Sequence, residues 1–121
     1  MFDQYAFGNN TYLKTIILPK LQVGTNSMFA NSSIRDIQIP ELLAIRNNMF
    51  RNTNIQKLDL PKVSQISGVN FASASPFYVC NKLDTLILRN QELITAPIDA
   101  LTGLFNNATL MKNGSGYIYV P

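Results

Sequence analysis

The chain has 121 residues, 46% hydrophobic and 14% charged, with a formal net charge of +3 at pH 7. This length fits one domain, and no run of 18 apolar residues predicts a membrane-spanning helix. The one cysteine and the absence of histidine exclude an internal disulfide and a zinc cluster. The basic residues form no row, because Gln56 follows Lys14 and Arg35 at the same spacing, so no nucleic-acid partner is expected.

A repeat of 21 residues dominates the sequence. Pro19, Pro40 and Pro61 are 21 residues apart, and Phe29, Phe50 and Phe71 have the same spacing. Phe7 lies one residue out of step. A fixed period of this length is typical of a solenoid, in which one repeat cannot bury its apolar face alone. We therefore expect about five stacked coils in a single domain spanning residues 1–121.

Each repeat carries two aliphatic residues separated by one position, just before the proline. Side chains alternate along a strand, so these pairs predict short parallel β-strands whose inward residues form a continuous core. Proline ends strand pairing because it lacks an N–H group. The predicted inward pairs are Ile16/Leu18, Ile37/Ile39, Leu58/Leu60, Leu86/Leu88 and, in a degenerate fifth unit, Ile118/Val120.

The segments between the strands are short and rich in Asn and Ser, which predicts turns or single helical turns on the convex side. The fourth repeat, taken to begin at Phe71, contains an insertion of about seven residues at 72–79. One longer helix is predicted within residues 94–110, where Pro97 suits a first helical position.

One position, three residues before the first aliphatic residue of each repeat, holds Asn or Cys. We expect its side chains to form a ladder that bonds to the backbone of neighbouring coils. Cys80 is not predicted to be a nucleophile, because the chain has no histidine to act as its base. The members of this predicted ladder are Asn10, Asn31, Asn52 and Cys80.

The run Phe-x-x-Cys/Asn-x-x-Leu-x-x-Ile-x-Leu-Pro resembles the BspA-like class of bacterial leucine-rich repeats, over roughly residues 7–95 and more weakly in the tail. The resemblance implies a leucine-rich repeat solenoid in extracellular or cell-surface proteins of bacteria, or in proteins of their phages, that serve in adhesion or ligand binding. It implies no catalytic residues. The first residues lack the features of a signal peptide, and the repeats at both ends lack caps. We expect the chain to be a fragment of a larger protein; the alternative is a small protein whose ends are covered by a partner. If the parent protein is exported, its signal lies outside this chain.

The outward residues of the strands are the first candidates for ligand binding. They mix apolar, charged and aromatic side chains, which suits a protein or glycan ligand. The alternative is an ordinary exposed face, with Asp36 beside Lys57 as a weak ion pair. The predicted binding residues are Thr15, Ile17, Asp36, Gln38, Lys57, Asp59, Thr85, Ile87, Tyr117 and Tyr119.

The insertion in the fourth repeat is the second candidate. Loops that depart from a rigid scaffold often carry recognition, so Phe77 and Tyr78 are predicted to contact a partner; alternatively, they cover the convex side. No glycine-rich phosphate loop or calcium-binding run is present, so no cofactor or metal is expected.

The sequence is compatible with two functions. The first is a non-enzymatic protein- or glycan-binding module of a bacterial surface protein. The second is a structural or assembly component of a phage or prophage particle, or of a surface array, in which open terminal coils stack end to end. An enzyme has no support in the residues.

Overall fold

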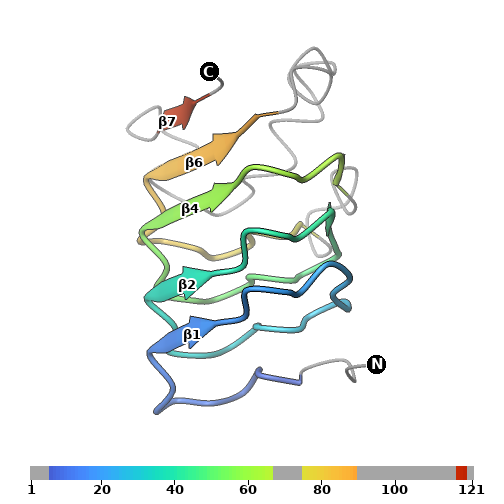
Figure 1. Cartoon of the computed structure of the whole chain (residues 1–121). Helices are drawn as coiled ribbons and strands as arrows, with labels where there is room; N and C mark the ends of the chain where they lie inside the picture. The colour runs from blue at the N-terminus through green and yellow to red at the C-terminus, as the bar shows by residue number, and fades with distance from the viewer. Residues whose placement is uncertain (1–5, 67–74, 90–116, 120–121) are drawn as a thin grey trace.

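The computed structural model describes residues 6–66, 75–89 and 117–119. The repeats stack on one another, with their strands side by side (Figure 1). The described residues contain no helix, so the single helical turns predicted on the convex side are replaced by turns; the helix predicted at 94–110 lies outside the described residues. The strands are β1 (Thr15–Ile17), β2 (Asp36–Gln38), β3 (Ala44–Ile45), β4 (Lys57–Leu60), β5 (Gln65–Ile66), β6 (Thr85–Leu88) and β7 (Tyr117–Tyr119).

The strand pairs are parallel and keep the predicted inward residues in register. Ile16 lies opposite Ile37 in the β1–β2 pair, and Leu58 lies opposite Leu86 in the β4–β6 pair. Ile118 continues this row opposite Leu86 in the β6–β7 pair. Ile16, Leu58 and Leu86 are buried, as alternation along a strand requires. The prediction of short parallel strands is confirmed.

The strands do not form one continuous sheet, although a strand in each of the stacked repeats would allow one. β1 pairs with β2, β4 pairs with β6, and β6 pairs with β7, but no ladder joins β2 to β4. A second ladder, which the sequence did not predict, pairs β3 with β5 after the strand turn. The apolar pattern specifies which side chains face inward. It does not by itself specify how closely two backbones approach, because alternation fixes only the face on which each side chain lies.

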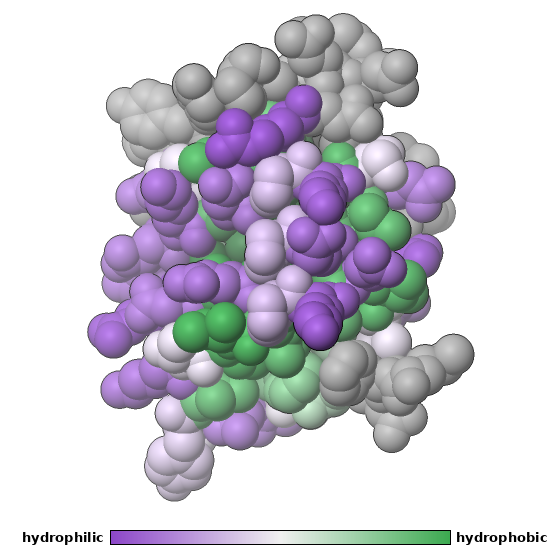
Figure 2. Space-filling model, in the orientation of Figure 1, coloured by the Kyte–Doolittle hydropathy of each residue, from purple (hydrophilic) through white to green (hydrophobic). Residues whose placement is uncertain are grey.

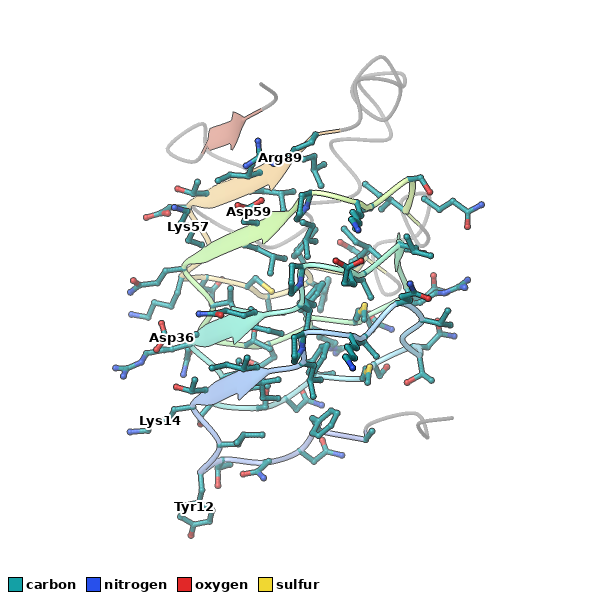
Figure 3. All side chains as sticks on the ribbon, in the orientation of Figure 1. Tyr12, Lys14, Asp36, Lys57, Asp59 and Arg89 are labelled. Carbon is teal, nitrogen blue, oxygen red and sulfur yellow. The ribbon has the colours of Figure 1, made fainter. Side chains whose placement is uncertain are left out.

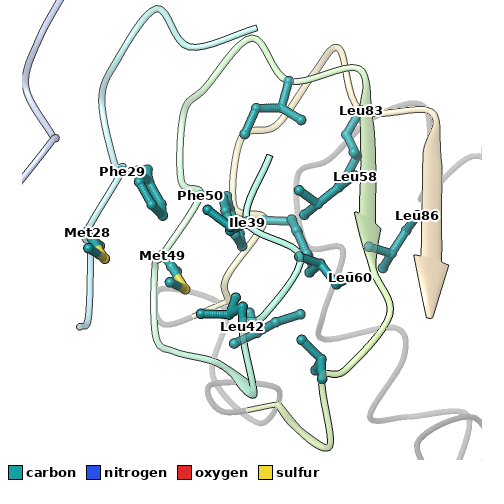
Figure 4. Close-up of a cluster of buried hydrophobic side chains, with 14 of the residues drawn as sticks. Met28, Phe29, Ile39, Leu42, Met49, Phe50, Leu58, Leu60, Leu83 and Leu86 are labelled. Atoms are coloured by element: carbon teal, nitrogen blue, oxygen red, sulfur yellow. The ribbon is translucent and has the colours of Figure 1, made fainter. Parts of the chain in front are cut away.

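A stack of four phenylalanine rings runs through the repeats. The ring centroids of Phe7 and Phe29 are 5.8 Å apart, those of Phe29 and Phe50 5.6 Å, and those of Phe50 and Phe77 5.5 Å. Figure 4 shows Phe29 and Phe50 beside Met28 and Met49, with the aliphatic residues of the strands on the other side of the core. The fourth member is Phe77 and not Phe71, so the extra residues of the fourth repeat come before the stacked ring.

The asparagine ladder also differs from the prediction. Asn31 donates from Nδ2 to Asn9 Oδ1 at 3.3 Å, and Asn52 donates from Nδ2 to Asn31 Oδ1 at 3.2 Å. These bonds join side chains, not a side chain to the neighbouring backbone. Asn9 therefore replaces Asn10, whose Oδ1 instead accepts the N–H groups of Tyr12 and Leu13 at 2.9 Å.

Backbone conformation explains why asparagine recurs in this row. The φ angles of Asn9, Asn31 and Asn52 are 54°, 56° and 52°, in the left-handed region that asparagine tolerates better than most residues. In the fourth repeat Val79 has the corresponding positive φ of 59°. Val79, and not Cys80, therefore continues this row.

Candidate functional site

The exposed face of the strands carries most of the predicted binding residues. We call it the outer strand face and define it by Thr15 and Ile17 of β1, Asp36 and Gln38 of β2, Lys57 and Asp59 of β4, and Thr85 and Ile87 of β6. The residues of β1, β2 and β4 are exposed, and those of β6 are half-buried. The backbones of Tyr117 and Tyr119 extend the same rows, opposite Thr85 and Ile87.

A groove opens at the centre of this face, where β2 and β4 are not paired. Its main part has a volume of about 400 Å³, and an adjoining part has about 210 Å³. The two parts share Ile37, Gln38 and Asp59. We call this feature the β2–β4 groove. Arg35, Asp36, Gln56 and Lys57 complete the lining of the main part, and Ile39, Pro40 and Pro61 complete the lining of the adjoining part.

Missing backbone hydrogen bonds mark the groove. At the start of the β1–β2 pair, Lys14 O accepts the N–H of Asp36 at 3.1 Å. At the start of the β4–β6 pair, Gln56 O accepts the N–H of Thr85 at 3.2 Å. The equivalent bond between Lys57 N–H and Arg35 O is not formed among the described residues. Ile37 is consequently half-buried, whereas the equivalent Ile16, Leu58 and Leu86 are buried.

The opening is local, because the same two repeats are hydrogen-bonded on both sides of it. Before the strands, Asn54 N donates to Ile34 O at 3.0 Å; after them, Ser64 N donates to Leu43 O at 2.9 Å. The β3–β5 ladder adds further backbone pairing beyond the turn. These contacts hold the two edges of the groove in place.

Charges of both signs surround the groove, and only some of them are paired. Among the described residues, Asp59 forms an ion pair at 3.6 Å with Arg89, the residue after β6. Lys62 forms an ion pair with Glu41 at 2.7 Å. The predicted ion pair between Asp36 and Lys57 is not formed within 4.0 Å. Both side chains are exposed and available to a ligand. Figure 3 shows them on neighbouring strands.

Comparison with known families identifies the repeats. Six copies of the BspA type leucine-rich repeat region match residues 1–109. The chain belongs to this family. The six copies exceed the five units predicted from the sequence. No curated protein and no solved structure matches the chain significantly. BspA-type repeats are usually found in surface proteins.

Phe77 and Tyr78, the residues of the fourth repeat that were predicted to contact a partner, are not fully exposed. Phe77 is buried in the ring stack, so it is not accessible to a partner. Tyr78 is half-buried, and the guanidinium carbon of Arg51 lies 4.8 Å from its ring centroid, a cation–π contact. Its carbonyl oxygen accepts the N–H of Asn52 at 2.9 Å. Both residues therefore connect the fourth repeat to the third.

Cys80 lies in a row of buried hydrogen-bond donors and not in the asparagine ladder. Its Sγ donates to Phe50 O at 2.8 Å, and Thr53 Oγ1 donates to the same oxygen at 2.9 Å. Ser32 makes the equivalent bond to Phe29 O at 2.7 Å. Burial raises the pKa of the Cys80 thiol from 9.0 to about 11, which outweighs the opposite effect of the hydrogen bonds. At neutral pH Cys80 is a protonated, inaccessible thiol.

The described part of the chain offers little to other chemistry. It contains no group of three or more His, Cys, Asp or Glu side chains that could hold a metal ion. None of its segments is a helix long and apolar enough to cross a membrane. Sequence reasoning selected four of the residues that line the groove, Asp36, Gln38, Lys57 and Asp59, but missed Arg35 and Gln56. Their signal was available, because both immediately precede a strand, 21 residues apart.

Proposed function

We propose that this chain is a non-enzymatic binding module of a bacterial surface protein, and that it engages a protein or glycan ligand outside the cell through the outer strand face. The observation that carries this proposal is the β2–β4 groove, a concave polar site at the centre of an exposed sheet face. Ligand sites are typically concave, with a few polar groups that fix orientation.

The groove suits binding better than catalysis. Asp36 and Asp59 are exposed, and no histidine exists in the chain to transfer a proton. Cys80, the single cysteine of the chain, is buried, and its Sγ donates to Phe50 O. The proposal needs no cofactor, metal or nucleic acid.

Lys57→Ala is expected to weaken ligand binding about tenfold or more, because a hydrogen bond to a charged group contributes roughly 1.5–3 kcal/mol. The measurement is surface plasmon resonance of the purified chain against immobilised extracellular-matrix proteins and a glycan array. Lys62→Ala is the matched control, since Lys62 is equally a lysine at the surface but lies outside the groove. Equal loss in both variants, or loss in neither, would contradict the assignment of the outer strand face.

A second function, assembly into a phage or prophage particle or a surface array, is favoured by apolar exposure in the first repeat. Ile17 is 58% exposed and Val23 66%, beside a hollow of about 400 Å³ lined by residues 18–23. Figure 2 shows the corresponding hydrophobic area near the β1 end of the stack. Among the described residues, β1 has a hydrogen-bonded neighbour on one edge only, and open edges favour pairing with another chain.

If this end mediates assembly, the mass in solution should rise with protein concentration, and Val23→Lys should abolish the rise. The lysine places a charge in the apolar area and repels a second copy. Size-exclusion chromatography with light scattering over a concentration series measures the mass in solution. A wild-type mass that stays monomeric throughout would exclude self-assembly and favour the binding module.

A further inference from the structure

We propose that the β2–β4 groove binds a neutral oligosaccharide. This inference rests on the proposed function of the outer strand face and narrows it from protein or glycan to one ligand class. It depends on four properties of the groove: its charge balance, its hydrogen-bonding groups, its apolar surface and its shape.

The charges that line the groove cancel. Arg35 and Lys57 contribute two positive charges, and Asp36 and Asp59 contribute two negative charges. Asp59 also forms an ion pair at 3.6 Å with Arg89, which lies outside the lining. An anionic ligand, such as a nucleic acid or a sulfated glycan, would meet two carboxylates as well as two cations. A neutral ligand meets no such opposition, and desolvated like charges are costly in a binding site.

The hydrogen-bonding groups match hydroxyls. Gln38 and Gln56 each supply donors and an acceptor. The groove also contains backbone groups whose counterparts between β1 and β2 are hydrogen-bonded. Leu18 N donates to Gln38 O at 2.9 Å, but the equivalent bond between β2 and β4, from Ile39 N–H to Asp59 O, is not formed. The Lys57 N–H and Arg35 O are unbonded to each other as well. A sugar hydroxyl both donates and accepts, so it can satisfy either kind of group.

The lining also has an aliphatic part, against which the C–H surface of a sugar ring can pack. Ile37 is half-buried, Pro40 is exposed and Pro61 is half-buried. None of the lining residues is aromatic. The groove therefore lacks the Trp and Tyr side chains that dominate many protein–protein interfaces.

The shape favours an elongated ligand. The two adjoining parts, of about 400 and 210 Å³, follow one another along β2 and β4 and share three lining residues. Their size is comparable with the roughly 300–1,000 Å³ of small-molecule sites. The hydrogen bonds of Asn54 and Ser64 fix the repeats on either side, so little ordering is needed when the ligand binds.

The unpaired strand edges can be tested without a ligand. Amide hydrogen exchange of Lys57 and Ile39 should be faster than that of their equivalents Asp36 and Leu18, which are hydrogen-bonded to the neighbouring repeat. Equal protection would show that β2 and β4 pair in solution, and it would overturn the proposal because the groove would be closed.

The ligand class is tested by titrating the ¹⁵N-labelled 121-residue chain with neutral probes, maltotetraose and chitotetraose, and with a heparin tetrasaccharide as the anionic probe. A neutral probe should shift the amide signals of Lys57 and Ile39. Gln38→Leu should weaken its binding about tenfold or more, since it removes a donor and an acceptor but keeps the side-chain volume. Gln65→Leu is the matched control, an exposed strand glutamine on the β3–β5 ladder.

Three results would overturn the proposal. The first is no shift with either neutral probe at about 10 mM, a concentration that detects even millimolar affinity. The second is binding of the heparin probe alone. The third is equal weakening by Gln38→Leu and Gln65→Leu. Lys57→Met is a second groove variant in case the spectrum of Gln38→Leu shows misfolding. If the neutral probes fail while a matrix protein binds and loses affinity with Lys57→Ala, the glycan assignment is wrong and the proposed binding function stands.

Discussion

Leu58→Asp is expected to unfold the protein. Leu58 is 1% exposed in the middle of β4 and lies opposite Leu86 of β6. A carboxylate there would have no partner, and burying an unpaired charge costs several kcal/mol. Whole domains are stable by only about 5–15 kcal/mol, so one such change removes much or all of the stability. Far-UV circular dichroism and urea denaturation measure the loss.

The neighbouring positions provide the controls for Leu58→Asp. Lys57→Asp places the same side chain one residue away on the exposed face and should leave the fold intact. Ile37→Asp should be milder than Leu58→Asp, because the β2–β4 groove leaves Ile37 half-buried. A folded Leu58→Asp variant with an unfolded Lys57→Asp variant would mean that the two faces of the strands are reversed.

Phe50→Ala is expected to lower the free energy of unfolding by about 3–5 kcal/mol, the usual cost of removing a buried aromatic ring. Phe50 is fully buried between Phe29 and Phe77, with centroids at 5.6 and 5.5 Å. The variant leaves a cavity in the middle of the stack and removes two aromatic contacts, each of which contributes roughly 0.5–1.5 kcal/mol beyond burial. Urea denaturation followed by circular dichroism gives the value.

Phe7→Ala is the comparison for Phe50→Ala, since Phe7 is in the first repeat and only partly buried. Its cost should be clearly smaller. Phe77→Ala tests the corrected alignment of the fourth repeat: it should resemble Phe50→Ala, because Phe77 is buried and its ring stacks on that of Phe50. If Phe77→Ala cost no more than Phe7→Ala, the assignment of Phe77 to the stack would be wrong.

The repeats of this chain are stacked in the same way, but the hydrogen bonds between neighbouring strands can differ from one pair to the next. The backbone bonds from Asp36 to Lys14 and from Thr85 to Gln56 show the ordinary step. The step between β2 and β4 omits the equivalent bond, and the polar groove lies there. A groove therefore arises from local separation of two strands while the core row of Ile16, Leu58 and Leu86 stays packed.

The sequence by itself did not predict β3 and β5, but it determined where β1, β2, β4 and β6 lie and which of their residues face inward. This was possible because strand side chains alternate with a period of two and because the repeat aligned Ile16, Leu58 and Leu86 at one position. The exposed residues Asp36, Gln38, Lys57 and Asp59 followed from the same alternation. Their meeting around one groove did not, since alternation carries no information about the distance between strands.

Only the tertiary structure decided which of two nearby residues of the same type occupies a repeated position, and how far apart neighbouring strands lie. Phe71 keeps the period of 21, yet Phe77 fills the stack; Asn10 keeps the spacing to the strand, yet Asn9 bonds to Asn31. In each case two candidates of the same type lie a few residues apart, and only packing against the preceding repeat distinguishes them. The gap between β2 and β4 likewise depends on backbone hydrogen bonds, which the alternation of side chains does not by itself specify.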